Sequence, residues 1–362
     1  MKMPAEIIRE EIFKNCAIPF ARFMELALYC PETGYYETNK DNVGRAGDFI
    51  TSVSTGELFG QLLAFQFAEW LGAEVRSQRS EVRIVEAGAH DGKLARDILN
   101  WLKMHRAELF SKIEYWILEP SLTRQAWQKE TLVDFQPGIR WFTDFENLKP
   151  KTQNAKRTGI IFSNELLDAF PVHRFGWDAK SKTWFEWGVA LAGEKFTWAR
   201  LENSKFEIRN LELEAVLPDN YTVETSPAAE SWWREAAGVL THGKLLAIDY
   251  GHTEAEVFSP GRERGTLRAY HRHRVSDDLL ANPGEQDLTA HVNFSAIQKA
   301  GEAAGLATES FSTQPQFLTR ILGAAMKDKT FGDWTAKRTR QFQTLTHPEH
   351  LGRAFRVLVQ SR

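Results

Sequence analysis

The chain has 362 residues, of which 43% are hydrophobic and 26% are charged. This is the composition of a globular protein, and it excludes a disordered, collagen-like or coiled-coil chain. The formal net charge of −3 at pH 7 provides no overall basic field for nucleic acid or an anionic membrane, so we expect a small-molecule or protein partner.

Cysteine usage and the first residues indicate the compartment. The two cysteines, Cys16 and Cys30, form no CxxC pattern, so no disulfide framework is predicted. The spacing of His271, His273 and His291 matches no common zinc site, so we expect no metal. The sequence lacks the apolar run of a membrane span and the apolar core of a signal peptide. We therefore expect an unprocessed cytoplasmic protein with no membrane insertion.

The first 80 residues predict helices around a loop. Apolar residues at helical spacing indicate a helix over 20–30, which ends before Pro31 and Gly34. A glycine-bearing loop follows at 42–52, and the apolar pattern of 58–71 predicts a long buried helix. We expect residues 1–80 to form a helical and lid segment.

Strands and helices then alternate. Strands are predicted at 83–89, 114–120, 139–144 and 158–167, with a helix at 94–105 and another before the third strand. Because these strands are apolar without alternation, they suit the inside of a parallel sheet covered on both faces. Residues 81–171 therefore predict the first part of a doubly wound α/β domain.

The pattern changes at residue 172. Residues 172–223 alternate aromatic and polar residues and predict inserted antiparallel β-hairpins. Nine of the twelve tryptophans lie between Trp116 and Trp233, which favours a second small core over an aromatic surface. Residues 224–362 return to the α/β pattern. They predict a helix at 227–240, a strand at 243–252, a long Arg/His-rich loop, a helix at 294–304 and strands at 307–312 and 355–360.

The turn in RIVEAGAHDGKLARDIL is the first candidate site. Glu86 ends a buried strand, and Gly88 and Gly92 lie in the turn before a helix, where doubly wound sheets bind ligands. The G-x-x-x-G spacing lacks the GxGxxG pattern of a nicotinamide dehydrogenase. A carboxylate there would repel pyrophosphate but suit S-adenosylmethionine, whose sulfonium and ammonium are positive. The alternative is a plain strand-to-helix turn.

Acids also follow the next two strands. Glu119 would accept the hydroxyls of a ribose, or it is a solvated strand-end carboxylate. Asp144 would take the amino group of adenine while Phe145 packs against the ring. Three successive strands that each end in an acid at one sheet edge favour an adenosyl cofactor.

Polar residues after the fourth strand predict the site of a methyl acceptor. Asn164, Glu165 and Asp168 follow an apolar strand and should lie beside the reactive end of the cofactor. If the acceptor is a guanidinium, Glu165 and Asp168 could bind it as a carboxylate pair. The alternative is that Asn164 and Asp168 cap a helix. The basic residues of 262–274 could hold RNA phosphate, but a solvated loop paired with acidic neighbours is favoured.

Long segments across nearly the whole chain resemble the MidA family of class I methyltransferases, whose mitochondrial members assist assembly of respiratory complex I. The segments are PFARFMELALYCPETGYY, GRAGDFITS, EAGAHDG, SNELLDAFPVH, ETSPAAESW, LLAIDYG and GTLRAYHRHRV through DLTAHVNFSAI. The resemblance implies a seven-stranded, mostly parallel sheet with an antiparallel last hairpin. It also implies S-adenosylmethionine as cofactor and, as in the mitochondrial member, methylation of an arginine on a complex I subunit.

The resemblance also implies roles for individual residues. The cofactor turn would be Glu86, Gly88 and Gly92, with Glu119 on the ribose, and the acceptor side would be Asn164, Glu165 and Asp168. A loop over the cofactor would include Gly47, Asp48, Phe49, Thr51 and Ser52.

Two departures from the family stand out. Ala89 and His90 replace the proline and glycine of ELGPGRG, and Val53-Ser54 replaces a Pro-Glu. Two functions follow from these patterns. The first is a protein methyltransferase acting by direct displacement, with a respiratory complex subunit as a candidate partner. The alternative is a non-catalytic, S-adenosylmethionine-binding assembly factor or chaperone that grips its partner through the aromatic insertion.

Overall fold

The structure is a computed structural model that describes residues 2–38, 51–76, 81–148, 157–201, 217–271, 274–329 and 331–362. The chain forms two compact units. The first unit contains Met1–Asn39, Asp168–Ser231 and Gly251–Ile297, and the second contains Lys40–Leu167, Trp232–Tyr250 and Gln298–Arg362. The four-segment division expected from the sequence stays a prediction.

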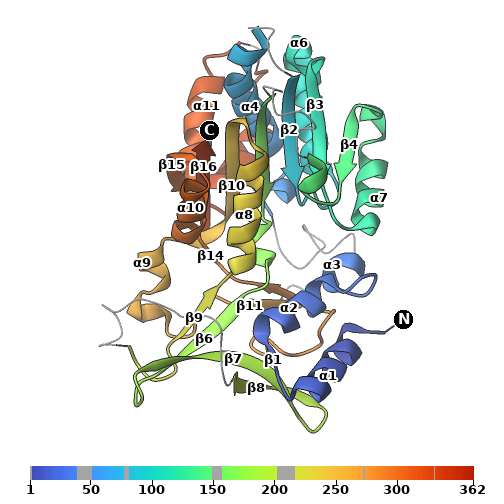
Figure 1. The fold of residues 1–362 in the computed structure, drawn as a ribbon. Helices are drawn as coiled ribbons and strands as arrows, with labels where there is room; N and C mark the ends of the chain where they lie inside the picture. The colour runs from blue at the N-terminus through green and yellow to red at the C-terminus, as the bar shows by residue number, and fades with distance from the viewer. Residues whose placement is uncertain are drawn as a thin grey trace. The chain divides into compact units, whose positions relative to one another are not determined.

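The second unit is built on a mostly parallel sheet. Its strand order is β15-β16-β10-β5-β2-β3-β4, so β4 and β15 are the edge strands (Figure 1). The strands are β2 (Glu81–Ala87), β3 (Ile113–Leu118), β4 (Ile139–Phe142), β5 (Arg157–Asn164), β10 (His242–His252), β15 (Ala307–Thr313) and β16 (Phe355–Ser361). β16 runs antiparallel to both neighbours, and the other pairings along this order are parallel. The predicted class I methyltransferase sheet with an antiparallel last hairpin is therefore confirmed.

The core of the second unit lies between this sheet and its helices. The helices are α4 (Leu58–Arg76), α5 (Lys93–His105), α6 (Ala107–Phe110), α7 (Leu122–Thr131), α11 (Gln314–Ala325) and α12 (Ala336–Thr346). Leu62 and Phe67 of α4, Ile98 of α5 and Phe317 of α11 pack with Phe162 of β5 in one buried cluster. Burial of such side chains contributes about 1.5–3 kcal/mol each.

Helices α11 and α12 lie in a region for which the sequence analysis predicted no element. Both begin at a threonine cap: Thr313 accepts a hydrogen bond from the Gln316 amide, and Thr335 accepts one from the Arg338 amide. A proline in the first turn also favours the start of α11, because a first-turn residue needs no amide hydrogen. These caps are the local signals that could have identified the two helices.

The first unit contains helices and two small sheets. Its elements include α1 (Pro4–Asn15), β1 (Ile18–Pro19), α2 (Phe20–Tyr29), α3 (Tyr35–Thr38), β6 (His173–Asp178), β7 (Thr183–Ala192), β8 (Lys195–Leu201), β9 (Thr222–Thr225) and α9 (Glu254–Val257). Strands β1, β7, β6 and β9 pair in this order, with β8 on β7, and every pairing is antiparallel. The predicted hairpins are confirmed. So is a second small core, which includes Phe175, Trp177 and Tyr221.

The Arg/His-rich segment differs from the prediction of a long loop. It contains β11 (Arg268–His271) and β12 (Arg274–Ser276), and β11 also pairs with β13 (Asp287–Thr289). The pairing of Ala269 with Leu288 buries both side chains, and such a long-range partner leaves no local signal in the sequence.

β14 (Val292–Asn293) pairs with the end of β10. Helices α8 (Pro227–Val239) and α10 (Phe294–Ala303) each cross a boundary between the units in sequence.

Among the residues that the structure describes, no helix is long and apolar enough to cross a membrane.

Candidate active site

The predicted site residues of the second unit come together at the carboxyl edge of its sheet. Ala87 of β2 pairs with Leu118 of β3 and with Ser163 of β5, which aligns the ends of these strands. The Glu119 amide then donates to the Phe142 carbonyl at 2.8 Å. The ends of these neighbouring strands, or the residues just after them, therefore place five polar residues at one edge, where open α/β sheets bind ligands: Glu86, Glu119, Asp144, Asn164 and Glu165.

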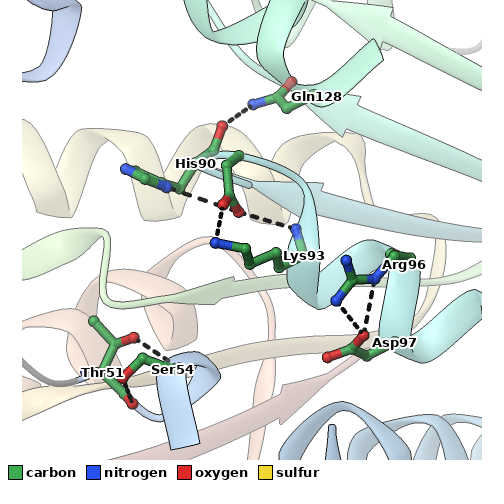
Figure 2. Close-up of polar contacts among 8 residues, drawn as sticks. Thr51, Ser54, His90, Lys93, Arg96, Asp97 and Gln128 are labelled. Atoms are coloured by element: carbon green, nitrogen blue, oxygen red, sulfur yellow. Dashed lines mark hydrogen bonds and ion pairs between the residues drawn. The ribbon is translucent and has the colours of Figure 1, made fainter. Parts of the chain in front are cut away.

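The turn after β2 depends on left-handed backbone conformations. Gly88 has a φ of +69° and Gly92, at the start of α5, a φ of +82°. A Cβ on Gly88 would lie 2.7 Å from Cδ1 of Leu166, closer than packed atoms approach. His90 has a φ of +46°, so it adopts a glycine-like conformation at some cost in strain. Its carbonyl accepts a hydrogen bond of 3.0 Å from Nε2 of Gln128, as Figure 2 shows.

Asp91 braces the same turn. Its Oδ1 accepts a hydrogen bond from the Lys93 amide at 3.1 Å, and Nζ of Lys93 lies 2.7 Å from its Oδ2. Burial would raise the pKa of Asp91, but His90 and Lys93 together hold that pKa well below its usual range. The side chain of Asp91 is therefore an ionised structural support for the turn at neutral pH.

Glu86 is a buried acid on β2. The hydroxyl of Tyr115 on β3 donates to its Oε2 at 2.5 Å. Burial raises the pKa of Glu86 to about 8, against the opposing effect of the Tyr115 hydrogen bond, and the charges of Asp91 and Asp97 raise it further. A cation bound nearby would favour the ionised form. The sequence analysis missed Tyr115, because a tyrosine inside an apolar strand resembles ordinary core.

Glu119 has no exposed surface and already has protein partners. Its Oε1 accepts from the Ser121 amide at 3.1 Å and lies 3.1 Å from Nη2 of Arg124. Its Oε2 accepts from Nε2 of Gln128 at 3.1 Å, so Gln128 joins this acid to the turn at His90. Contact of Glu119 with a ribose stays a prediction. It would require one carboxylate oxygen of Glu119 to accept a further hydrogen bond or to lose one of its present partners.

Asp144 is exposed and caps the short helix η3 (Glu146–Leu148). Its Oδ1 accepts from the backbone and side-chain nitrogens of Asn147 at 3.0 and 2.9 Å. These hydrogen bonds lower the pKa of Asp144. Phe145 is buried, with its ring 5.4 Å from that of Trp232. Adenine binding by Asp144 and Phe145 stays a prediction.

The end of β5 presents buried acceptors without partners. Glu165 has a φ of +51°, and its Oε1 accepts from Nδ2 of Asn164 and from the Ser52 amide, each at 3.1 Å. Glu165 is partly exposed as a residue, but its Oε2 is buried. This oxygen, Oδ1 of Asn164 and Oγ of Ser163 have no hydrogen-bond partner among the described residues. Native proteins rarely leave such atoms unpaired, so Oε2 of Glu165 and Oδ1 of Asn164, on adjacent residues, are the acceptors available to a ligand, whereas Ser163 faces the other side of the strand.

Desolvation also acts on the Glu165 carboxyl. Burial raises its pKa to about 8, the hydrogen bonds from Asn164 and Ser52 oppose this, and the charge of Asp249 adds to it. A cation close by would favour the ionised form of Glu165 at neutral pH.

Asp249 of β10 fixes the turn that follows β5, and the sequence analysis missed it. It is fully buried, and its Oδ2 accepts from the amides of Leu166 and Leu167 at 3.1 and 2.8 Å. The missed signal was an acid after the apolar strand LLAI, the same pattern that identified Glu86.

Asp168 belongs to the first unit by contacts. It lies in the short helix η4 (Leu167–Ala169), is buried, and its carbonyl accepts from the Ala290 amide at 2.9 Å. The pairing of Asp168 with Glu165 stays a prediction. The alternative was that Asn164 and Asp168 cap a helix. The side chain of Asn164 instead donates to Glu165, and the helical element that follows is the three-residue η4.

The predicted loop over the cofactor is described only at its end. Gly47, Asp48 and Phe49 lie outside the described residues. Thr51 and Ser54 hold each other through the hydrogen bonds drawn in Figure 2. Ser52 is fully buried and contacts Glu165.

Comparisons with known proteins identify the family and its cofactor. A family model described as an S-adenosyl-L-methionine-dependent methyltransferase matches residues 62–312. A structure from Burkholderia thailandensis, bound to S-adenosyl-homocysteine, is similar with a TM-score of 0.83 and 32% identity over 99% of this chain and 92% of that chain. A second, native structure from Burkholderia thailandensis is similar with a TM-score of 0.81 and 31% identity over 99% and 91%.

Curated relatives are also similar over most of the chain. A Drosophila melanogaster protein, named a mitochondrial homolog of protein arginine methyltransferase NDUFAF7, is 27% identical over 98% of this chain and 84% of its own. The Bos taurus mitochondrial protein arginine methyltransferase NDUFAF7 is 26% identical over 94% and 79%. The expectation of a cytoplasmic protein is contradicted, because these relatives are named as mitochondrial proteins.

The residues at the sheet edge fit a cofactor that carries positive charge. The turn contains Gly88 and Gly92 at positive φ, Glu86 is an acid with a raised pKa, and the β5 end carries buried acceptors without partners among the described residues. With the family match over more than half of the chain, the MidA resemblance is confirmed. The chain belongs to the S-adenosyl-L-methionine-dependent methyltransferases of this family, and S-adenosyl-L-methionine is its cofactor.

Proposed function

We propose that this protein methylates an arginine side chain of a protein partner, and that the acceptor binds at the end of β5. The observation that carries this proposal is the buried Oε2 of Glu165, which has no hydrogen-bond partner among the described residues. The Ser52 amide and Asn164 hold Oε1, so Oε2 is the oxygen left for a substrate. The names of the relatives, which are protein arginine methyltransferases, support arginine as the acceptor.

A guanidinium matches the chemistry of this edge. It carries five N–H donors and no acceptor, and Oε2 of Glu165 and Oδ1 of Asn164 are acceptors. A positive charge at this point would favour ionised Glu165 and offset the burial that raises its pKa. Asp168 is proposed as a further carboxylate for the substrate.

The proposed roles divide between cofactor and acceptor. When bound, S-adenosylmethionine supplies a methyl group activated by its sulfonium charge. Gly88 and Gly92 would contact it through the backbone, and the acids proposed for its charge, ribose and adenine are Glu86, Glu119 and Asp144.

The acceptor residues would orient the nucleophile. Asn164 and Glu165 would hold the guanidinium so that one nitrogen faces the methyl group, and such positioning contributes much of the rate in a direct displacement. Glu165 Oε2 would then hold the proton that this nitrogen loses. The loop residues Thr51 and Ser52, with Gly47, Asp48 and Phe49, are proposed to complete the cofactor side.

The proposed partner is a protein. A subunit of a respiratory complex is the candidate that the MidA resemblance implies, and the mitochondrial names of the relatives support it.

Methyl transfer to synthetic peptides tests the proposal. The protein is incubated with S-adenosylmethionine labelled in its methyl group and with a library of arginine-containing peptides, and labelled residues are identified after acid hydrolysis. We expect label in methylarginine, with none when lysine replaces arginine. Label that appears only in lysine or another residue would contradict arginine as the acceptor.

A further inference from the structure

A buried chain of hydrogen bonds connects helix α12 to Glu165. Nε2 of Gln314, the first residue of α11, donates to the Leu345 carbonyl of α12 at 2.9 Å. Oε1 of Gln314 accepts from the Ser52 hydroxyl at 3.1 Å, and the Ser52 amide donates to Oε1 of Glu165 at 3.1 Å. The three contacts join residues that are far apart in the sequence but lie within the second unit.

Burial fixes which group donates and which accepts in each of these hydrogen bonds. Gln314, Ser52 and Leu345 have no exposed surface, so water does not compete for these groups. The Leu345 carbonyl is an acceptor only, so the amide nitrogen of Gln314 must face it and the amide oxygen must face Ser52. The Ser52 hydroxyl then donates its proton to Gln314. The Ser52 side chain is held by this bond, and the Ser52 carbonyl also accepts from the Thr55 hydroxyl at 2.9 Å.

The packing of the next residues supports this arrangement. Gly56 has a φ of +128°, and a Cβ at that position would lie 1.8 Å from Nε2 of Gln341 on α12. Helix α12 therefore approaches the segment that carries Ser52 directly at Gly56, in addition to its indirect connection through Gln314. The segment is held both by the chain through Gln314 and by this close approach.

We infer that Gln314 is a positioning residue for methyl transfer, because through Ser52 it orients the Glu165 carboxyl so that Oε2 faces the acceptor. This inference rests on the proposed role of Glu165. Gln314 acts through Ser52 and needs no contact with substrate or cofactor. The two C-terminal helices, α11 and α12, would thus contribute to the acceptor side of the site.

The environment of Glu165 gives the inference a measurable consequence. The groups that act on it are Asn164 on its own strand, Ser52 from the loop and the charged Asp249 of β10. Burial and Asp249 raise its pKa, whereas Asn164 and Ser52 lower it. A displaced Ser52 amide would remove a stabilising hydrogen bond from the ionised form, so the pKa of Glu165 would rise further.

The test is a carbon-13 NMR titration of glutamate side-chain carboxyls in the full-length protein. The signal of Glu165 is assigned by its loss in Glu165→Gln. Gln314→Leu removes both hydrogen bonds of the amide, and Ser52→Ala removes the hydroxyl alone with a smaller change of volume. Gln360→Leu is the matched control. Gln360 is also fully buried and bridges Trp233 and Gln298, at 2.7 and 3.0 Å, but takes no part in this chain.

We expect the Glu165 midpoint to rise by about half a pH unit or more in Gln314→Leu and Ser52→Ala, and to stay unchanged in Gln360→Leu. An unchanged midpoint in both test variants, or the same rise in the control, would overturn the inference. Methyl transfer by Glu165→Gln separates the two proposals. Retained turnover would contradict the proposed function even if the midpoint moves, whereas lost turnover with an unmoved midpoint contradicts only the role of Gln314.

Discussion

Replacement of Glu165 by glutamine should stabilise the protein at alkaline pH. The glutamine oxygen can take the place of Oε1 and keep the hydrogen bonds from Asn164 and the Ser52 amide. Its nitrogen then takes the place of Oε2, which has no partner among the described residues. The fold therefore loses no hydrogen bond, but a donor now lies where the proposed substrate presents donors.

The magnitude follows from the pKa of Glu165, which burial raises from 4.5 to about 8. Between these values the unfolded chain ionises while the folded protein keeps the carboxyl protonated, so ionisation favours unfolding increasingly as the pH rises. At 1.36 kcal/mol for each pH unit, the cost is at most about 3 kcal/mol at pH 7 and about 5 kcal/mol above pH 8. Glutamine has no such cost, and below pH 4.5 the two proteins should be equally stable.

Urea unfolding at pH 5, 7 and 8.5, without ligands, measures this difference. Glu349→Gln, at an exposed position, is the control and should show no pH-dependent gain. The reasoning is refuted if Glu165→Gln is no more stable than the wild type at pH 8.5, or if its advantage is larger at pH 5 than at pH 8.5.

Three further predictions concern the turn and its supports. Gly88→Val should abolish binding of S-adenosylhomocysteine in calorimetry, because a branched side chain is strained at a φ of +69°; Gly72→Ala, with open space around it, should bind normally, and equal binding by both would contradict the placement of the cofactor. Asp249→Asn should lower the free energy of unfolding in urea by about 1–3 kcal/mol, since one buried oxygen of Asp249 accepts from two backbone amides. It should also reduce turnover more than cofactor affinity. An unchanged urea midpoint would count against this role. Tyr115→Phe should raise the pKa of Glu86 further and weaken cofactor binding more at pH 7 than at pH 9, as measured by calorimetry at both values; a pH-independent loss would show that the charge of Glu86 is not involved.

The sheet and its acidic edge could be predicted because local patterns specify them. Apolar runs that end in Glu86, Glu119 and Glu165 identify inner strands of a parallel sheet, and parallel strands must bring their ends to one edge. The functional positions at that edge therefore followed from the order of residues alone. The sequence could not show which groups each acid contacts. Glu119, for example, already accepts hydrogen bonds from Ser121 and Gln128.

The contributions of distant segments could not be predicted in this way. Ser52 and Gln314 are 262 residues apart, and a polar residue at the start of a helix resembles a surface position. Asp249 accepts hydrogen bonds from the amides of Leu166 and Leu167 in the turn after the neighbouring strand, which lie 83 and 82 residues away in the sequence. Only the folded sheet shows that these side chains support Glu165.

The most direct test of the account compares Glu165→Gln with the wild type in two assays on the same samples: binding of S-adenosylhomocysteine by calorimetry and methyl transfer to an arginine-containing peptide. The account predicts cofactor affinity within about threefold of the wild type and a loss of turnover of at least about 100-fold, as expected when a positioned proton acceptor is removed. Turnover retained by this variant would contradict the assignment of Glu165 to the acceptor side of the site.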